Sequence, residues 1–214
     1  MAAAPEKIAE LRQKLAERFP SAQRNLGRTL ATSLPAIDDH ADGLPLGAVT
    51  EFVCTAPSCG SQLLIGQLLA ATRAHRIRTA LVDAADSFDP SSFPPDLLAH
   101  LVWVRCMATN ALSATDLLAR DANLGLVILD LRHDAEAELR RTPSTTWYRL
   151  QRAVEPAALA LVVLTPRASV PSAQLRFVLN TAHSAAALTT ERPALAVALS
   201  PTLQRQRLHV ALAG

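Results

Sequence analysis

Short apolar runs alternate with amphipathic stretches from residue 48 onward. The apolar runs have the length of strands, and the stretches between them carry apolar residues at helical spacing. Strands joined by helices form right-handed crossovers, so we expect an α/β fold with a mostly parallel sheet and helices on both faces. The predicted strands are Ala48–Val53, Thr79–Val82, Leu101–Arg105, Leu126–Leu131 and Leu159–Thr165, and the predicted helices are Ser61–Arg73, Asn110–Arg120 and Thr145–Val154.

The pattern changes after Pro166. Two further apolar segments, Ala173–Thr181 and Ala194–Leu199, are joined by short polar links. Short connections favour antiparallel neighbours, so we expect antiparallel strands at the C-terminal end of the sheet. The last segment, residues 201–214, has no acidic residue and is either a tail that orders on a partner or a last strand.

The N-terminal segment has the pattern of a short amphipathic helix, with Pro5 in its first turn. The apolar positions that share one face are Ile8, Leu11, Leu15 and Phe19. So short a helix needs a surface to cover this stripe, which is either its own domain or a partner. We therefore divide the chain into a helix and linker (1–33), a core (34–200) and a C-terminal tail (201–214).

Composition and charge narrow the class of protein. Half of the 214 residues are apolar, enough for one domain, and the net charge of +2 is too small to indicate a dedicated nucleic-acid or membrane binder. The three cysteines lack the spacing of a zinc site or a disulfide framework, so we expect buried free thiols and no metal. No apolar run reaches the roughly 20 residues of a spanning helix, and no signal peptide is visible. We expect a cytoplasmic protein without membrane contact.

Three features lie at the carboxyl ends of predicted strands, where parallel sheets bind ligands. The loop Cys54–Gln62 connects a strand to a helix, which is the place of a phosphate-binding loop. Asp83 ends one apolar strand and Asp130 ends another. A carboxylate at such a position is typical of a magnesium-binding Walker B element, and it is also common as a cap of the following loop.

The segment before the first core strand resembles the entry to the RecA-type recombinase core. The matching residues are Ile37-Asp38, Gly43-Leu44-Pro45-Leu46-Gly47 and Thr50-Glu51. The stretch TALVDAADSFDP, residues 79–90, is similar to the RecA strand that ends in Asp-Ala-Glu and closes with Asp-Pro. Together with the strand that ends near Asp130, these elements resemble RecA in order and spacing over roughly residues 34–200. The resemblance implies a RecA-like fold.

The loop departs from the GxxxxGK[ST] pattern of a working P-loop. Neither an ungapped nor a one-residue-shifted alignment places a lysine in it, and the resemblance to RecA puts Ala85 where the water-activating glutamate belongs. Phosphoryl transfer depends on positioning and charge stabilisation, so we predict no enzyme activity and no cofactor, with weak anion or nucleotide binding left open. The expected vestigial nucleotide pocket comprises Cys54, Ser58, Cys59, Gly60, Ser61, Gln62, Asp83, Asp86 and Asp130.

Two longer stretches resemble the ImuA family, RecA- and SulA-related partners of a translesion-synthesis cassette. They are LVWVRCMATNALSATDLLARDANLGLVILDL (101–131) and RRTPSTTWYRLQRAVEPAALALVVLTP (140–166). The resemblance implies a non-catalytic accessory protein in SOS-induced translesion DNA synthesis. Its implied partners are ImuB, an inactive Y-family polymerase homologue, a DnaE-type error-prone polymerase and RecA. Two alternatives stay open: an ATP-binding ATPase or sensor with a relocated lysine, and a SulA-like inhibitor of cell division that binds FtsZ.

Basic and aromatic residues after the Walker-B-like strand are candidate contacts to DNA or a partner. They are Arg132, Arg140, Arg141, Trp147, Arg149 and Arg152. Acidic residues are interleaved with them, so the segment also fits a mixed solvated face and DNA contact is uncertain. Trp147 and Tyr148 fit base stacking, whereas a Trp three residues before Leu150 in an amphipathic helix also fits the core.

Overall fold

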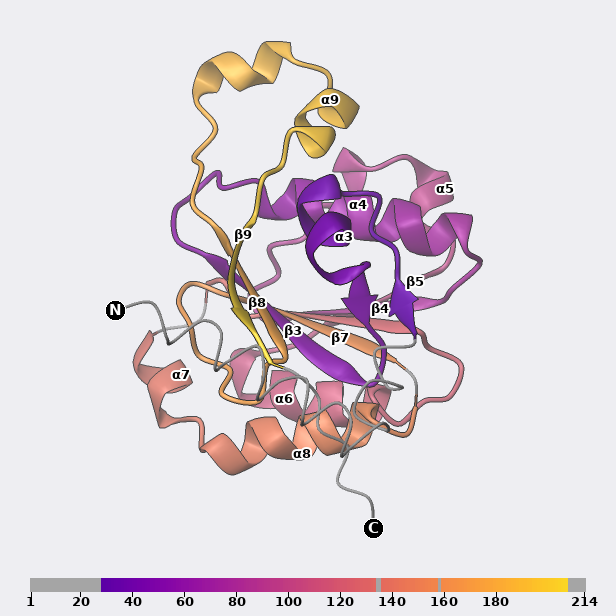
Figure 1. The fold of residues 1–214 in the computed structure, drawn as a ribbon, viewed down its shortest axis with the longest axis vertical. Helices are drawn as coiled ribbons and strands as arrows, with labels where there is room; N and C mark the ends of the chain where they lie inside the picture. Colours follow the sequence, from indigo (N-terminus) through magenta and orange to yellow (C-terminus); the bar gives the residue numbers. More distant parts are fainter. Residues whose placement is uncertain (1–27, 134–135, 158, 208–214) are drawn as a thin grey trace, which may run out of the picture.

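The computed structural model describes residues 28–133, 136–157 and 159–207. Its main sheet has seven strands in the order β5-β4-β6-β7-β3-β8-β9, and a two-stranded antiparallel sheet, β1-β2, lies beside it (Figure 1). Neighbouring strands of the main sheet are parallel except for β8 and β9. The predicted α/β fold with a mostly parallel sheet is therefore confirmed.

The elements follow the predicted alternation closely, with boundaries within about two residues of those expected for the central strands and the helices between them. The strands are β1 (Thr29–Leu30), β2 (Leu44–Pro45), β3 (Ala48–Cys54), β4 (Thr79–Asp83), β5 (Leu101–Arg105), β6 (Leu126–Asp130), β7 (Ala160–Thr165), β8 (Leu175–Leu179) and β9 (Thr202–Gln206). The helices are α3 (Pro35–Ala41), α4 (Ser61–Ala74), α5 (Pro95–Leu98), α6 (Ala108–Leu118), α7 (Glu136–Arg141), α8 (Ser144–Val154) and α9 (Arg192–Val197), with short 3-10 turns at Pro90–Ser92 and Ala185–Thr189.

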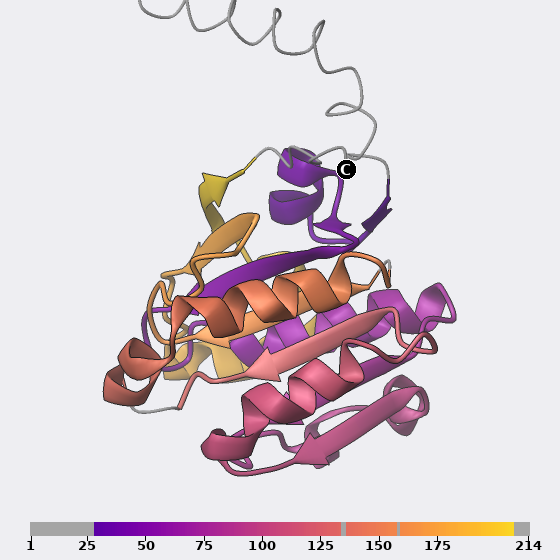
Figure 2. The ribbon, with the colours of Figure 1, turned by 90° about the horizontal axis from the view of Figure 1, so that it is seen from below.

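Helices cover both faces of the sheet, as Figures 1 and 2 show. One face packs against α3, α4 and α5 and the segment around α9, and the other packs against α6, α7 and α8. The central strands β3, β4, β6 and β7 are buried along their whole length. Such strands need apolar residues at successive positions, which is why the sequence pattern located them.

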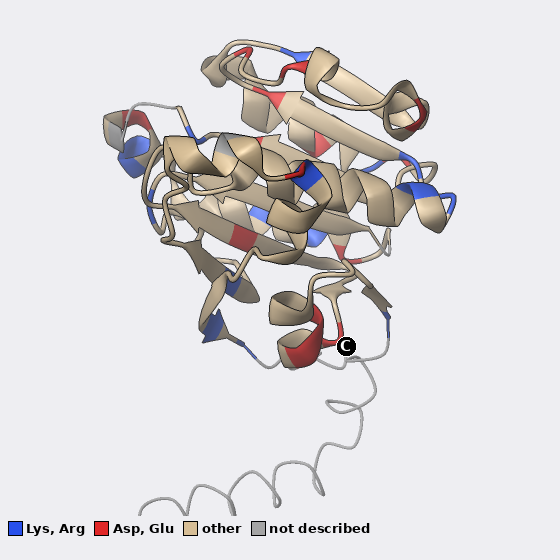
Figure 3. Cartoon of the chain, turned by 90° about the horizontal axis from the view of Figure 1, so that it is seen from above, with Lys and Arg blue, Asp and Glu red and all other residues tan. Residues whose placement is uncertain are grey.

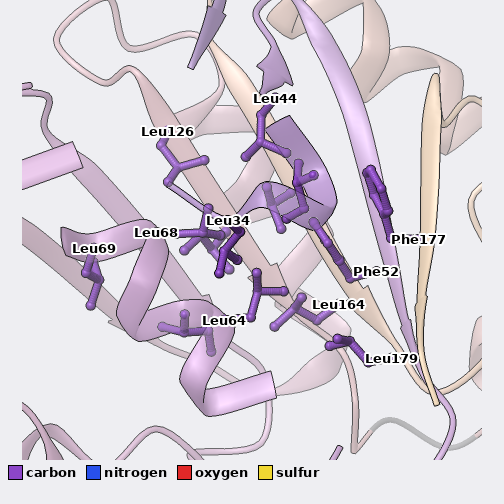
Figure 4. Close-up of a cluster of buried hydrophobic side chains, with 14 of the residues drawn as sticks. Leu34, Leu44, Phe52, Leu64, Leu68, Leu69, Leu126, Leu164, Phe177 and Leu179 are labelled. Carbon is purple, nitrogen blue, oxygen red and sulfur yellow. The ribbon is translucent and has the colours of Figure 1, made fainter. Parts of the chain in front are cut away.

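The larger hydrophobic core lies between the sheet and α4 (Figure 4). Leu64 and Leu68 of α4 are fully buried there, together with Leu34 at the start of α3. The rings of Phe52 on β3 and Phe177 on β8 stack with centroids 5.3 Å apart, so the two strands are joined by side chains as well as by backbone hydrogen bonds. The core thus holds the β3–α4 connection, which carries the candidate phosphate loop, on a rigid base.

A buried ion pair fixes the opposite face of the same strands. The Glu51 side chain is fully buried, and its Oε2 accepts from Arg176 Nε of β8 at 2.6 Å. Its Oε1 accepts from Thr165 Oγ1 at 2.9 Å and from the backbone N–H groups of Ser169 and Val170 at 2.6 and 3.1 Å. Because both carboxylate oxygens accept hydrogen bonds and the charge is paired with Arg176, the glutamate can be tolerated inside the sheet.

The C-terminal part of the prediction needs two corrections. The strand expected at 173–181 is observed at Leu175–Leu179 and runs parallel to β3. The nine residues 166–174 between β7 and β8 return the chain to the end of the sheet at which the parallel strands begin. The strand expected at Ala194–Leu199 is wrong: α9 begins with a proline in its first turn, and a short apolar run does not distinguish helix from strand. Residues 202–206 are the antiparallel edge strand β9, so the expected antiparallel end of the sheet is confirmed.

Within the part of the chain that the structure describes, no helix combines the length and the apolar character needed to cross a lipid bilayer. The N-terminal stripe of Ile8, Leu11, Leu15 and Phe19 lies outside the described residues, and its helix stays a prediction.

Candidate functional site: a degenerate phosphate loop

The loop between β3 and α4 has the strand–turn–helix setting of a phosphate-binding loop. The strand ends at Cys54 and the helix begins at Ser61, with Gly60 as its N-cap at φ +86°. Ser58 also has a positive φ of 59°, a value that costs a non-glycine residue free energy. The turn is therefore held in a special backbone conformation even though most of its residues differ from a working P-loop.

The segment that connects β8 to β9 covers this loop. The backbone N–H of His183 donates to the Ser58 carbonyl at 2.9 Å. Leu199 lies directly against Gly60, since a Cβ added to the glycine would come within 2.4 Å of Leu199 Cδ2. Beside this contact a cavity of about 670 Å³ opens between the loop and residues 183–195, with Ser61 and Arg132 among its lining residues.

Arg132 points into the site and engages its two potential metal ligands. Its Nε donates to Asp130 Oδ1 at 2.8 Å and its Nη2 to Oδ2 at 2.5 Å, a bidentate ion pair. Its Nη1 donates to Ser61 Oγ. The side chains of Arg132 and Asp130 are only 9% and 1% exposed, so the guanidinium is the cation that compensates the buried carboxylate.

The position of Arg132 corrects its prediction as a surface contact to DNA or a partner. The signal that sequence reasoning missed is the spacing in Asp130-Leu131-Arg132: residues two apart at the end of a strand point to the same side. The cation of the site therefore comes from the residues that directly follow β6.

The second carboxylate, that of Asp83, caps the turn that follows β4. Asp83 and Asp130 are paired neighbours on β4 and β6. The Asp83 carboxylate accepts from the backbone N–H groups of Ser87 and Phe88 at 3.0 and 2.9 Å and from Trp103 Nε1 at 3.3 Å. Burial acts to raise the pKa of Asp83, but these hydrogen bonds outweigh it and hold the pKa below its usual range. Asp83 is therefore the loop cap that the sequence left as an alternative.

The structure separates Asp86 from the other residues of the predicted pocket. Asp86 has a positive φ of 53° and forms an exposed ion pair with Arg105 at the edge of the sheet. It is not among the residues that line the cavity beside the loop. Gln62, by contrast, lines that cavity, and its Nε2 donates to the Ser87 carbonyl at 3.4 Å. Of the predicted pocket, the structure brings together Cys54, Ser58, Cys59, Gly60, Ser61, Gln62 and Asp130, and adds Arg132.

Replacing Asp83 by asparagine is expected to lower the free energy of unfolding by about 1–3 kcal/mol at pH 7, because amide hydrogens then face N–H donors. The folded-state pKa of Asp83 lies below its unfolded value of about 3.9, so the carboxylate stabilises the protein above that pH and the benefit is lost as pH falls through the folded pKa. The gap between wild type and variant should narrow below about pH 4. Urea unfolding of both proteins at pH 7 and below about pH 4 measures the difference in unfolding free energy. A difference that grows on acidification contradicts the role of Asp83 as a loop cap.

The surface candidates separate into one buried and several exposed residues. Trp147 is 1% exposed in the core under α8, so of its two predicted roles the core position is the one observed and base stacking is not. Arg140, Arg141, Arg149 and Arg152 are exposed, and Arg149 approaches Asp116 at 3.6 Å. Figure 3 shows acidic and basic positions interspersed over a mostly uncharged chain. The exposed arginines stay candidate contacts.

Comparison with known proteins bears on the fold. A solved structure described as the RadB recombinase matches this chain with a TM-score of 0.57 and 14% sequence identity, over 70% of this chain and 82% of that chain. No family model matches the sequence, and no curated protein matches it. At this identity the likeness concerns the fold alone, and the core of this protein is RecA-like.

Proposed function

We propose that this RecA-like chain is a non-catalytic accessory protein that acts through protein contacts in damage-induced translesion DNA synthesis. The observation that carries the non-catalytic part is the contact of Arg132 with both Asp130 and Ser61. In nucleotide-hydrolysing P-loop proteins the corresponding carboxylate and hydroxyl hold magnesium beside the phosphates. A guanidinium bound to both groups supplies the positive charge from within the chain.

The residues around the loop do not fit a magnesium nucleotide. Both lysines of the chain, Lys7 and Lys14, belong to the N-terminal segment, so the described residues hold no lysine to replace the one missing from the loop. Leu199 lies against Gly60, where a phosphate would need open backbone N–H groups. Ala85 supplies no base. These features support the absence of ATP hydrolysis and argue against a relocated lysine.

The proposed partners come from the resemblance to the ImuA family. We propose a complex with an ImuB-like inactive polymerase homologue in the cytoplasm, with RecA and a DnaE-type polymerase as further members of the assembly. The N-terminal stripe is the proposed docking element, because its apolar positions are spaced for one helix face. The RecA-like core then serves as a rigid support, and direct DNA contact is not required for this role.

A pull-down tests the complex. Purified full-length chain at micromolar concentration is expected to retain the ImuB-like homologue from the same genome, and Leu11→Asp is expected to reduce retention at least tenfold by placing a charge in the stripe. Lys14→Asp, on the polar side of the predicted helix, is the matched control and should leave retention unchanged. No retention by the wild-type chain, or equal loss in both variants, would contradict the proposal.

Isothermal titration with ATP and magnesium tests the site itself. We expect no binding tighter than about 1 mM and no phosphate release, because the loop lacks its lysine and Arg132 occupies the metal-ligand pair. An active RecA protein serves as the positive control. A micromolar dissociation constant with turnover would instead support the alternative of a nucleotide-dependent enzyme.

A further inference from the structure

A cavity lies between the start of α8 and the loop that joins β7 to β8. Its volume is about 350 Å³, and it shares no lining residue with the cavity beside the phosphate loop. Three arginines, Arg140, Arg167 and Arg176, are among the residues that line it, and none of its described lining residues is an aspartate or a glutamate. The wall therefore presents guanidinium groups without a carboxylate among them, which suits a negatively charged ligand.

Arg176 is held in place by contacts within the sheet. Its side chain is 15% exposed, its Nε donates to Glu51 Oε2 at 2.6 Å, and its Nη2 donates to the Val170 carbonyl at 3.0 Å. These bonds use two of the five N–H donors of a guanidinium, so Arg176 can bind a further acceptor without leaving Glu51. The backbone N–H groups of Ser169 and Val170 also donate to Glu51, which ties the loop to the buried ion pair. This part of the wall is thus rigid before any ligand binds.

Two further arginines and a helix end add donors to the wall. Arg167 belongs to the loop and is half-buried, whereas Arg140 is exposed on α7. A guanidinium has five N–H donors, so each of them can bind a ligand in addition to its contacts within the chain. Ser144, the first residue of α8, also lines the cavity, and the N-cap residue Pro143 supplies no side-chain cap. The first-turn N–H groups and the dipole of this helix of 11 residues favour a negative charge at its start.

The rest of the wall is largely apolar. Trp147 and Leu139 are 1% and 5% exposed, and both line the cavity together with Pro171. Such a surface can pack against the carbon atoms of a ligand while the arginines bind its charged end. An aspartate or glutamate side chain combines a short methylene stem with a planar carboxylate, and a guanidinium binds a carboxylate through two parallel hydrogen bonds. The cavity therefore matches a carboxylate-bearing side chain in both shape and charge.

The charges around the cavity favour a protein carboxylate over a nucleic-acid backbone. A nucleic-acid strand carries a charge on every nucleotide and is bound along a continuous basic path. Glu138 is exposed on the same short helix as Arg140 and lines a neighbouring cavity of about 150 Å³. Acidic and basic positions are also mixed over the rest of the surface (Figure 3). A confined cationic pocket within a mixed surface fits the insertion of a single carboxylate.

We propose that this cavity is a docking pocket for an acidic side chain of a protein partner, whose carboxylate binds among Arg140, Arg167 and Arg176. The partial burial of Arg167 and Arg176 strengthens such charge-assisted hydrogen bonds relative to contacts on an open surface. The pocket provides a second contact surface, separate from the N-terminal stripe. The inference requires only an acidic partner segment and does not depend on which protein supplies it.

Heteronuclear NMR of the full-length chain tests the proposal with a peptide probe. Acetylated tetraglutamate amide is expected to shift the indole N–H signal of Trp147 and the amide signals of Ser144 and Ser169, and to saturate with a dissociation constant below about 1 mM. Tetraglutamine with the same end groups is the uncharged comparison and should leave these signals in place. The absence of a saturable shift with tetraglutamate, or an equal shift with tetraglutamine, overturns the proposal. It is also overturned if single-stranded oligothymidylate shifts the same signals at lower concentration, because the pocket would then be a nucleic-acid site.

Two variants and one control locate the binding. Arg140→Gln and Arg167→Gln are each expected to weaken tetraglutamate binding about fivefold or more, since each removes a charged donor from the wall. Arg152→Gln removes an exposed arginine of α8 that does not line the cavity, and it should change the dissociation constant by less than about twofold. Arg140 is exposed, so its variant gives a result even if the replacement of Arg167 disturbs the loop. Equal weakening by Arg140→Gln and Arg152→Gln would indicate nonspecific attraction and contradict the pocket.

Discussion

Replacing Arg132 with methionine is expected to lower the free energy of unfolding by about 3–5 kcal/mol. The substitution leaves the Asp130 carboxylate, 1% exposed, without its cation and removes the donor to Ser61 Oγ. A buried charge that loses its partner costs far more than an exposed one, because water cannot replace the lost interaction. Chemical denaturation at pH 7 measures the loss.

Two comparisons isolate the cause of this loss. The double variant Asp130→Leu with Arg132→Met removes both charges and is expected to recover most of the stability, since a well-packed apolar pair avoids the cost of burial. Arg149→Met removes an exposed arginine, 56% accessible and 3.6 Å from Asp116, and should change the unfolding free energy by about 1 kcal/mol or less. If Arg132→Met costs no more than Arg149→Met, the inward arginine does not hold the site together.

Replacing Trp147 with alanine should cost about 3–5 kcal/mol of unfolding free energy. The indole is 1% exposed and packs in the core beneath α8, where Leu150 and Val154 are also buried. Its removal leaves a cavity that the parallel sheet on one side and the helix on the other cannot close. Thermal or urea unfolding followed by circular dichroism measures the effect.

The neighbouring residue provides the control for Trp147. Tyr148 is 47% exposed, so Tyr148→Ala is expected to change stability by about 0.5 kcal/mol or less. The same two variants separate packing from base stacking. If Trp147→Ala weakened the binding of single-stranded DNA while leaving stability unchanged, the indole would be a nucleic-acid contact and the buried position would be wrong.

Most of the central fold was predictable because its signal is local. The strand predicted at Ala48–Val53 is observed at Ala48–Cys54, and the helix predicted at Ser61–Arg73 extends by one residue. Strands buried on both faces need continuous apolar runs, and the helices between them show their own period. The segment 194–199 lacks such a signal, because six apolar residues without polar partners fit either structure, and the helix was set by Pro193 and by packing against α4.

The site was predictable in part. Its loop, its missing lysine and the carboxylate at the end of β6 follow from residues close together in the sequence. The inward position of Arg132 does not, because its partner Ser61 lies 71 residues away and comes near only when β6 and α4 meet at the same edge of the sheet. Asp83 and Asp130 end neighbouring strands but have different hydrogen-bond partners, because each carboxylate binds the turn that follows its own strand.

The sequence by itself determined the order of the central strands and helices and the loss of the lysine from the phosphate loop, because both are properties of neighbouring residues. The tertiary structure decided which way the polar side chains point. It turned Arg132 into the site, buried Trp147 and joined Glu51 to Arg176, because a buried charge or ring must find partners that only the folded chain brings within reach.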